Sequence, residues 1–272
     1  MHQVIPSEAD PAIGAFDDPS VAIAPPGLPA DAPLAIFLPG TNGIPGNGPL
    51  LRVVAQQGYR VLSLMYNDSP AVVGKCPRDP DPACSGDFRE MRIQGTGKSK
   101  AVQNSAAESI DARLVSTLRK LDHDYPGEGW GRYLDGDAPR WGNILVSGLS
   151  QGAGMAAWIA KRHKVRRVVL FSSPWDSTGA DSHPAPWLSE PSATPIARWQ
   201  AAYNARENTA NLIAPAYAAL GLGKAQIHIF TLDLPQALQT RSPNPYHGIG
   251  IRDLRYAPQW RAMYGKGSSA AE

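Results

Sequence analysis

Residues 143–154 read NILVSGLSQGAG, and the rest of the chain is organised around them. The apolar run 144–146 predicts a buried strand, and the run MAAWIA at 155–160 predicts a helix. Between the two lies the pattern G-x-S-x-G, with Ser150 at its centre. A serine on so sharp a turn has strained dihedrals, and the residues two before and two after it must lack a bulky Cβ. Gly148 and Gly152 meet this requirement, so we expect Ser150 to stand above the sheet edge at a helix N-terminus.

Two interpretations of Ser150 follow from this pattern. In the first, the turn presents the hydroxyl as a nucleophile, and the helix dipole favours negative charge beside it. In the second, the turn is merely glycine-rich and Ser150 is only the N-cap of the helix. The strand before the pentapeptide and the helix after it favour the first interpretation.

Apolar runs alternate with helical patterns along most of the chain. Strands are predicted at 34–38, 59–66, 168–171, 198–203 and 226–232, and helices at 50–57, 105–121 and 254–264. This alternation predicts an α/β fold with a mostly parallel, doubly wound sheet flanked by helices. Residues 1–33 are expected to form an irregular approach with an edge strand at 21–24. The polar segment 67–97 is expected to be a long loop excursion, which in a compact domain suggests substrate access.

Length and composition limit the remaining possibilities. The 272 residues contain no linker, so a single domain over 1–272 is expected. The net charge is only +2, and the basic run 161–167 is typical of a solvated helix end, so we predict no nucleic-acid partner. No apolar run is long enough for a membrane span, and no signal peptide is recognisable. GTGKS at 95–99 resembles a P-loop, but Arg92 occupies the first glycine position and no buried strand precedes it, which excludes nucleotide binding.

Cys76 and Cys84 are the two cysteines, and they enclose a proline-rich segment. Their spacing is not C-x-x-C and no histidine lies nearby, so no metal site is predicted. A disulfide closing this loop is expected, which favours a periplasmic or secreted location. The alternative is a pair of free thiols in a cytosolic protein.

Three anchors give the chain a recognisable resemblance. They are LPGT at 38–41, GLSQG at 148–152 and YNARE at 203–207. With these, the region 34–264 resembles the α/β-hydrolase superfamily, especially bacterial esterase/lipase-like members. The resemblance implies the α/β-hydrolase fold with little or no cap, and a catalytic triad whose members follow the order nucleophile, acid, histidine.

The resemblance assigns the other two triad members by their place in the chain. His247 is the histidine that follows the last predicted strand, although a histidine beside a glycine can also be a surface loop residue. Glu207 holds the position after the penultimate strand, where the family usually has aspartate. Asp176, after the preceding strand, is the alternative acid, and Asp233 is a third candidate.

The loop PGTNGIPG at 39–46, which leaves the strand 34–38, is similar to the family's oxyanion loop, although it can also be a simple turn. The N–H groups of Thr41 and Gln151 would then stabilise the oxyanion. The implied activity is hydrolysis of a small-molecule carboxylic ester through an acyl-enzyme, without metal or organic cofactor. An amidase, thioesterase or acyltransferase with the same triad remains an alternative, as does a non-catalytic binding protein on this scaffold. The oligomeric state is left open.

Overall fold

A mixed sheet of eight strands forms the centre of the protein. The computed structural model describes residues 1–179, 181–239 and 242–267. In spatial order the strands are β1 (His2–Val4), β2 (Ser20–Ile23), β4 (Arg60–Ser63), β3 (Leu34–Leu38), β7 (Ile144–Leu149), β8 (Arg167–Phe171), β11 (Trp199–Asn204) and β12 (Ile227–Phe230). β1 and β2 pair antiparallel at one edge, β2 pairs antiparallel with β4, and the other pairings are parallel. This sheet, flanked by helices, confirms the fold class predicted from the sequence.

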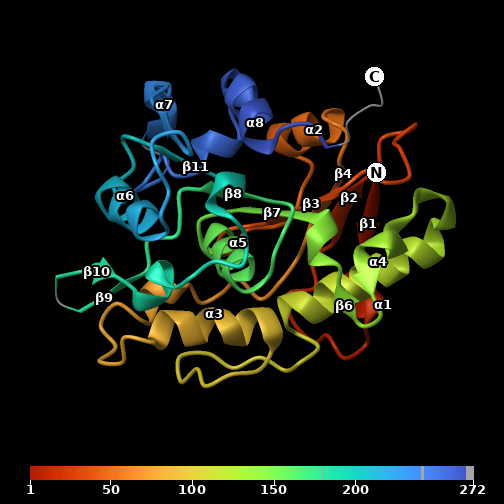
Figure 1. The fold of residues 1–272 in the computed structure, drawn as a ribbon, viewed down its shortest axis with the longest axis horizontal. Coiled ribbons are helices and arrows are strands. Elements are labelled where there is room, and N and C mark those ends of the chain that lie inside the picture. The colour runs from red at the N-terminus through yellow and green to blue at the C-terminus, as the bar shows by residue number, and fades with distance from the viewer. Residues whose placement is uncertain (180, 240–241, 268–272) are drawn as a thin grey trace.

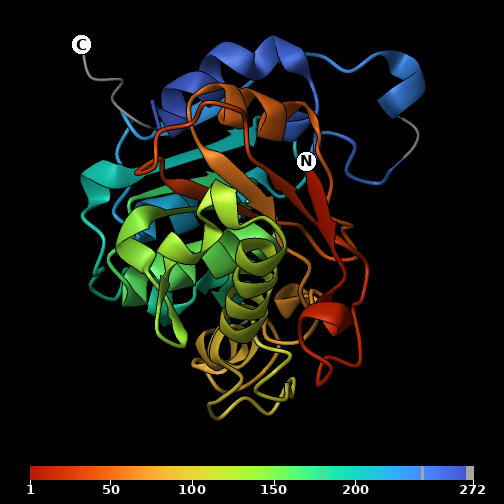
Figure 2. The same ribbon diagram turned by 90° about the vertical axis from the view of Figure 1, so that its right-hand side faces the viewer.

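Helices cover both faces of the sheet (Figure 1). On one face lie α3 (Cys84–Gln94), α4 (Ile110–Asp124) and α5 (Gln151–Arg162), and on the other α2 (Pro49–Gln56) packs beside α8 (Ala257–Tyr264). Figure 2 shows α2 and α8 together above the sheet, with α4 below it. The central strands β3, β7 and β8 are buried on both faces, which explains the unbroken apolar runs at 34–38, 144–146 and 168–171.

The core is divided between these two layers by the alternation of strand side chains. On β7, Ile144 and Val146 pack into the layer of α3, α4 and α5, whereas Leu145 and Leu149 pack into the layer of α2 and α8. All six residues of β7 are buried, so the strand lies at the centre of the fold. The segment that follows it is therefore held by both layers.

The remaining helices and hairpins lie outside the central sheet and its main helices. They are α1 (Pro6–Ala9), α6 (Ala210–Ala219), α7 (Gln236–Gln239) and two hairpins, β5 (Leu134–Asp135) with β6 (Ala138–Pro139) and β9 (Ser177–Thr178) with β10 (His183–Pro184). The predicted edge strand at 21–24 corresponds to β2, and β1 extends the edge beyond it. Among the described residues, no helix combines the length and apolar character needed to cross a bilayer.

The segment 67–97 is more structured than a loop. It contains the short 3-10 helix η1 (Val72–Gly74) and the eleven-residue helix α3. The apolar side chains Phe88, Met91 and Ile93 of α3 are buried against the rest of the core, and this burial compensates for the polar composition that predicts a loop. The predicted disulfide is confirmed, because Cys76 is bonded to Cys84, the first residue of α3.

Candidate active site

Ser150 occupies the turn between β7 and α5. Its backbone has φ 55° and ψ −123°, a region that non-glycine residues rarely adopt and that costs about 1–3 kcal/mol. The turn is fixed on both sides, because Ser150 N–H donates to the Phe171 carbonyl at 2.9 Å and the Ser150 carbonyl accepts from Gly154 N–H at 3.2 Å. The side chain is partly exposed, as a nucleophile must be. The sequence prediction of a strained serine at a helix start therefore matches the backbone.

The glycines around Ser150 are required by close packing. A Cβ on Gly148 would lie 2.4 Å from the Gly152 carbonyl carbon, and a Cβ on Gly152 would lie 2.0 Å from the Leu38 carbonyl oxygen. A third glycine, Gly40, lies across the site, where a Cβ would be 3.1 Å from Ser150 Cβ. The end of β3 is thus pressed against both the serine and the first turn of α5.

His247 and Glu207 lie in direct contact. His247 Nδ1 is 2.8 Å from Glu207 Oε2, and the Glu207 side chain is fully buried while that of His247 is 24% exposed. The other carboxylate oxygen, Oε1, accepts hydrogen bonds from Ser172 Oγ at 2.5 Å and from Asn204 N–H at 2.9 Å. A carboxylate can only accept, so in the neutral imidazole the hydrogen is on Nδ1 and Nε2 presents a lone pair.

The end of β8 connects Ser150 to the His247 loop. Phe171 binds the Ser150 N–H through its carbonyl. The hydroxyl oxygen of the next residue, Ser172, lies 3.2 Å from the His247 carbonyl, and its single hydrogen is donated to Glu207 at 2.5 Å. Gly250 packs the same loop against Phe171, since a Cβ there would lie 3.9 Å from the ring. No hydrogen bond joins Ser150 Oγ to His247 Nε2 within the described residues, and such contacts commonly tighten only when substrate binds. The Ser150–His247 contact therefore stays a prediction.

Asp176, the alternative acid, is engaged elsewhere. Its carboxylate receives Arg89 Nη2 at 2.5 Å and Arg89 Nε at 2.7 Å, together with Trp187 Nε1 at 3.0 Å. Both partners of this ion pair are buried, with side chains 1% and 0% exposed. Arg89 also donates to the Gln151 carbonyl at 3.4 Å, so the pair supports the first turn of α5 rather than an imidazole.

Asp233, the third candidate acid, pairs with Arg206 at the surface. Each of the other five histidines also has a different partner: His2 with Glu128, His123 with Asp124, His163 with Trp141, His183 with Asp181 and His228 with Gln200. Among the described residues, His247 is thus the histidine that contacts a buried carboxylate at the carboxyl ends of the strands, where Ser150 also lies.

The backbone of the loop after β3 is hydrogen-bonded to a carboxylate, Asp68, that sequence reasoning missed. Asp68, which is 1% exposed, accepts Asn42 N–H at 3.1 Å and Gly43 N–H at 3.0 Å. Burial raises the pKa of Asp68 above its ordinary value, although these two hydrogen bonds and Arg92 act in the opposite direction. The N–H groups of Asn42 and Gly43 are thus bound, whereas the N–H of Thr41 has no acceptor among the described residues. Gln151 N–H, the first of α5, likewise has no acceptor within its helix.

Sequence reasoning missed Asp68 and Arg89, and only the first of these has a recognisable signal in the sequence. Asp68 follows the strand 59–66, and a carboxylate at the end of a parallel strand is a recognisable signal. Arg89 lies in a helix among other charged residues, so nothing in the sequence distinguishes its buried role. In the segment 177–200, Trp187 and Trp199 are buried in the core.

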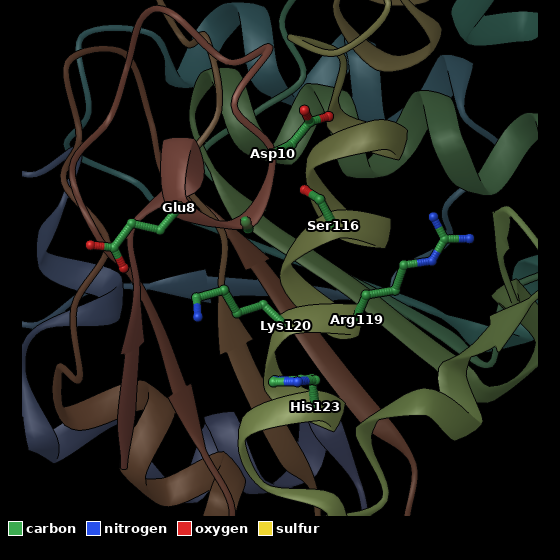
Figure 3. A pocket seen from close by; sticks show the side chains of 7 residues that line it. Glu8, Asp10, Ser116, Arg119, Lys120 and His123 are labelled. Carbon is green, nitrogen blue, oxygen red and sulfur yellow. The ribbon is translucent and has the colours of Figure 1, made fainter.

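A cavity of about 470 Å³ lies between α1 and α4, away from Ser150 (Figure 3). Charged side chains from both helices surround it, including Glu8, Arg119 and Lys120. It contains none of the predicted site residues. Among the described residues, no group of three or more histidine, cysteine, aspartate or glutamate side chains is placed to hold a metal ion.

Comparisons with known proteins were made by sequence and by structure. No protein-family model matches the sequence, and no curated protein is similar to it in sequence. The fold is similar to that of a thermophilic esterase from Thermogutta terrifontis, with 13% identity, 100% of this chain and 95% of that chain covered, and a TM-score of 0.49. It is also similar to an acetyl xylan esterase from Aspergillus awamori (13% identity, 81% and 79% covered, TM-score 0.44). A lidless serine hydrolase from Xanthomonas campestris matches at 11% identity, 92% and 91% covered, with a TM-score of 0.44. At such low similarity, the chemistry has to be inferred from the side chains themselves.

Proposed function

We propose that this chain, which has the α/β-hydrolase fold, is a serine hydrolase that cleaves carboxylic esters. Ser150 is the nucleophile, His247 the general base and Glu207 the acid that orients it. The observation that carries the proposal is the 2.8 Å contact between His247 Nδ1 and the fully buried Glu207 carboxylate. The His247 loop lies beside the end of β8, and the same strand end binds the Ser150 N–H. A buried carboxylate on Nδ1 is the arrangement that orients the imidazole of a general base in a serine triad.

In the acylation step, Ser150 Oγ attacks the ester carbonyl carbon and its proton passes to His247 Nε2. Glu207 stabilises the imidazolium that forms, without itself becoming protonated. The N–H groups of Thr41 and Gln151 bind the developing oxyanion. When the tetrahedral intermediate collapses, the proton on Nε2 moves to the alkoxy oxygen, and the alcohol leaves an acyl group on Ser150.

In the deacylation step, water replaces the alcohol. Its proton passes to His247 as the oxygen attacks the acyl carbon, and the same proton is then returned to Ser150 Oγ as the acid leaves. Both steps need the imidazole in the tautomer with hydrogen on Nδ1. Glu207 selects that tautomer, because both of its oxygens act only as acceptors.

A fluorophosphonate probe tests the nucleophile directly. We expect the folded protein to form a covalent adduct on Ser150, identified by mass spectrometry of the peptide, and Ser150→Ala to form none. Steady-state hydrolysis of p-nitrophenyl esters of increasing acyl length, with matched anilides and thioesters, tests the substrate class. A folded protein that forms no adduct and hydrolyses no ester would end the proposal and leave the binding-protein alternative.

A further inference from the structure

Two neighbouring cavities adjoin the proposed site. The first, of about 430 Å³, is lined by Gly40 and Leu149, which flank Ser150, and extends beneath α2. The second, of about 630 Å³, lies behind it, and the two share Pro49 and Arg252 in their linings. Both volumes are in the usual range for small-ligand pockets, roughly 300–1,000 Å³. Gly40, which lines the first cavity, also lies close to Ser150, since a Cβ on Gly40 would be 3.8 Å from Ser150 Oγ.

The walls of both cavities are mostly apolar. Phe37, Leu50 and Leu51 form the inner part of the first cavity. At its outer side Ile44 is 69% exposed, and in the second cavity Leu254 is 60% exposed. These two side chains extend the apolar lining of the cavities to the protein surface.

Arg252 introduces a charge into this apolar environment. Of the described residues that line the two cavities, only Arg252 and Asp253 are charged. The Asp253 carboxylate is already bound by Arg255, with Nε at 3.0 Å and Nη2 at 2.5 Å. Arg252 has neither an ion pair nor a side-chain hydrogen bond to any described residue. Arg252 is exposed, so the shared wall carries a solvent-accessible guanidinium that no described side chain binds directly.

The guanidinium of Arg252 lies directly against the loop of His247. A Cβ placed on Gly248 would be 3.2 Å from its Cζ and Nη1, so the group rests on the backbone beside the proposed base. Other carboxylates near the site are occupied: Glu207 by His247, and Asp68 by two backbone N–H groups. A planar guanidinium with free donors is suited to bidentate binding of a carboxylate.

We infer that Arg252 binds a carboxylate of the substrate, so that the preferred substrate is an ester whose apolar acyl chain ends in a second, ionised carboxyl group. This inference rests on the proposed function, since it needs the ester carbonyl at Ser150. The apolar chain occupies the first cavity, and its terminal carboxylate lies at the wall that the two cavities share. Arg252 acts in binding and takes no part in proton transfer.

Two esters with equal acyl chains test the inference: p-nitrophenyl hexanoate, and the p-nitrophenyl monoester of adipic acid, whose terminal methyl is replaced by a carboxylate. We expect the wild-type kcat/KM to favour the adipate monoester, with the preference in KM. Arg252→Gln should reduce the ratio of the two kcat/KM values by about 10–100-fold, as for loss of a charge-assisted hydrogen bond. Arg252→Lys keeps the charge but loses the planar fork, and should retain an intermediate ratio.

Arg52→Gln is the matched control. Arg52 is exposed on α2, whose first turn lines the first cavity, but Arg52 itself lines neither cavity, so its loss should leave the ratio unchanged. If the wild type hydrolyses neither ester, the proposed function fails and the inference fails with it. If it hydrolyses the hexanoate ester and the adipate preference is absent, or survives in Arg252→Gln, the inference is overturned while the hydrolase proposal stands.

Discussion

Replacing Glu207 by Gln and, separately, Asp176 by Asn distinguishes the two candidate acids with minimal change in shape. Glu207 accepts hydrogen bonds on both oxygens, from Ser172 Oγ and Asn204 N–H on one and from His247 Nδ1 on the other. In the Gln variant, the amide oxygen can satisfy only one of these sides. If it stays with Asn204, its NH2 group faces Nδ1 and forces the imidazole into the tautomer with hydrogen on Nε2.

That tautomer cannot accept the Ser150 proton. Loss of a correctly oriented base in a serine triad lowers kcat by about 10⁴-fold, and we expect a fall of roughly 10³–10⁴-fold for Glu207→Gln, equivalent to about 4–5.5 kcal/mol of transition-state stabilisation. Asp176→Asn should behave differently, because it leaves the buried guanidinium of Arg89 without its counter-ion. The expected cost is about 3–5 kcal/mol in the free energy of unfolding.

The assay combines steady-state hydrolysis of p-nitrophenyl acetate, normalised to folded protein, with urea unfolding followed by tryptophan fluorescence. Glu207→Gln should unfold near the wild-type midpoint but have little activity. Asp176→Asn should unfold at a clearly lower urea concentration and keep most of its kcat per folded molecule. The opposite pattern, with activity lost in Asp176→Asn and retained within tenfold in Glu207→Gln, would refute the assignment of the acid.

Three further outcomes are expected. Asp68→Asn places an amide NH2 against one of the two backbone N–H donors and loosens the Thr41 loop, so kcat should fall about 10–100-fold with little change in KM. This is less than the 10²–10³-fold fall for full loss of an oxyanion donor. Burial raises the pKa of Asp111 to about 7; between about pH 4 and 7 the folded chain then holds a proton that the unfolded chain releases, so stability falls as pH rises through this window. Asp111→Asn should remove that slope, as measured by urea unfolding at several pH values, and should raise the free energy of unfolding at pH 8 by roughly 1–3 kcal/mol. The gain is limited to this range because the helix dipole offsets part of the burial effect. An unchanged slope would contradict the prediction. Replacing Cys76 and Cys84 by serine should lower the free energy of unfolding by roughly 2.5 kcal/mol, as expected for a loop with a separation of eight residues. An unchanged unfolding midpoint would show that the packing of α3 holds the segment in place without the disulfide.

The sequence alone determined those features whose cause is local. The strand–turn–helix at Ser150 could be predicted because the two glycines flanking it at a spacing of two are needed wherever that turn forms, and the structure shows the backbone contacts that demand them. The alternation of apolar runs and helical patterns predicted the mostly parallel sheet for the same reason, since strands buried on both faces must be apolar throughout. The disulfide was predictable because Cys76 and Cys84 are the only cysteines and lie close together in the chain.

Only the tertiary structure decided which charged groups meet. Glu207 and Asp176 each follow a parallel strand, and no local pattern distinguishes a carboxylate that contacts a histidine 40 residues later from one that pairs with an arginine 87 residues earlier. Arg89 comes from the segment 67–97, whose polar composition predicts a loop, and it enters the core because its charge is neutralised there. Burial and pairing of ions depend on what the whole fold places beside each group, so they become visible only when the strands and helices are assembled.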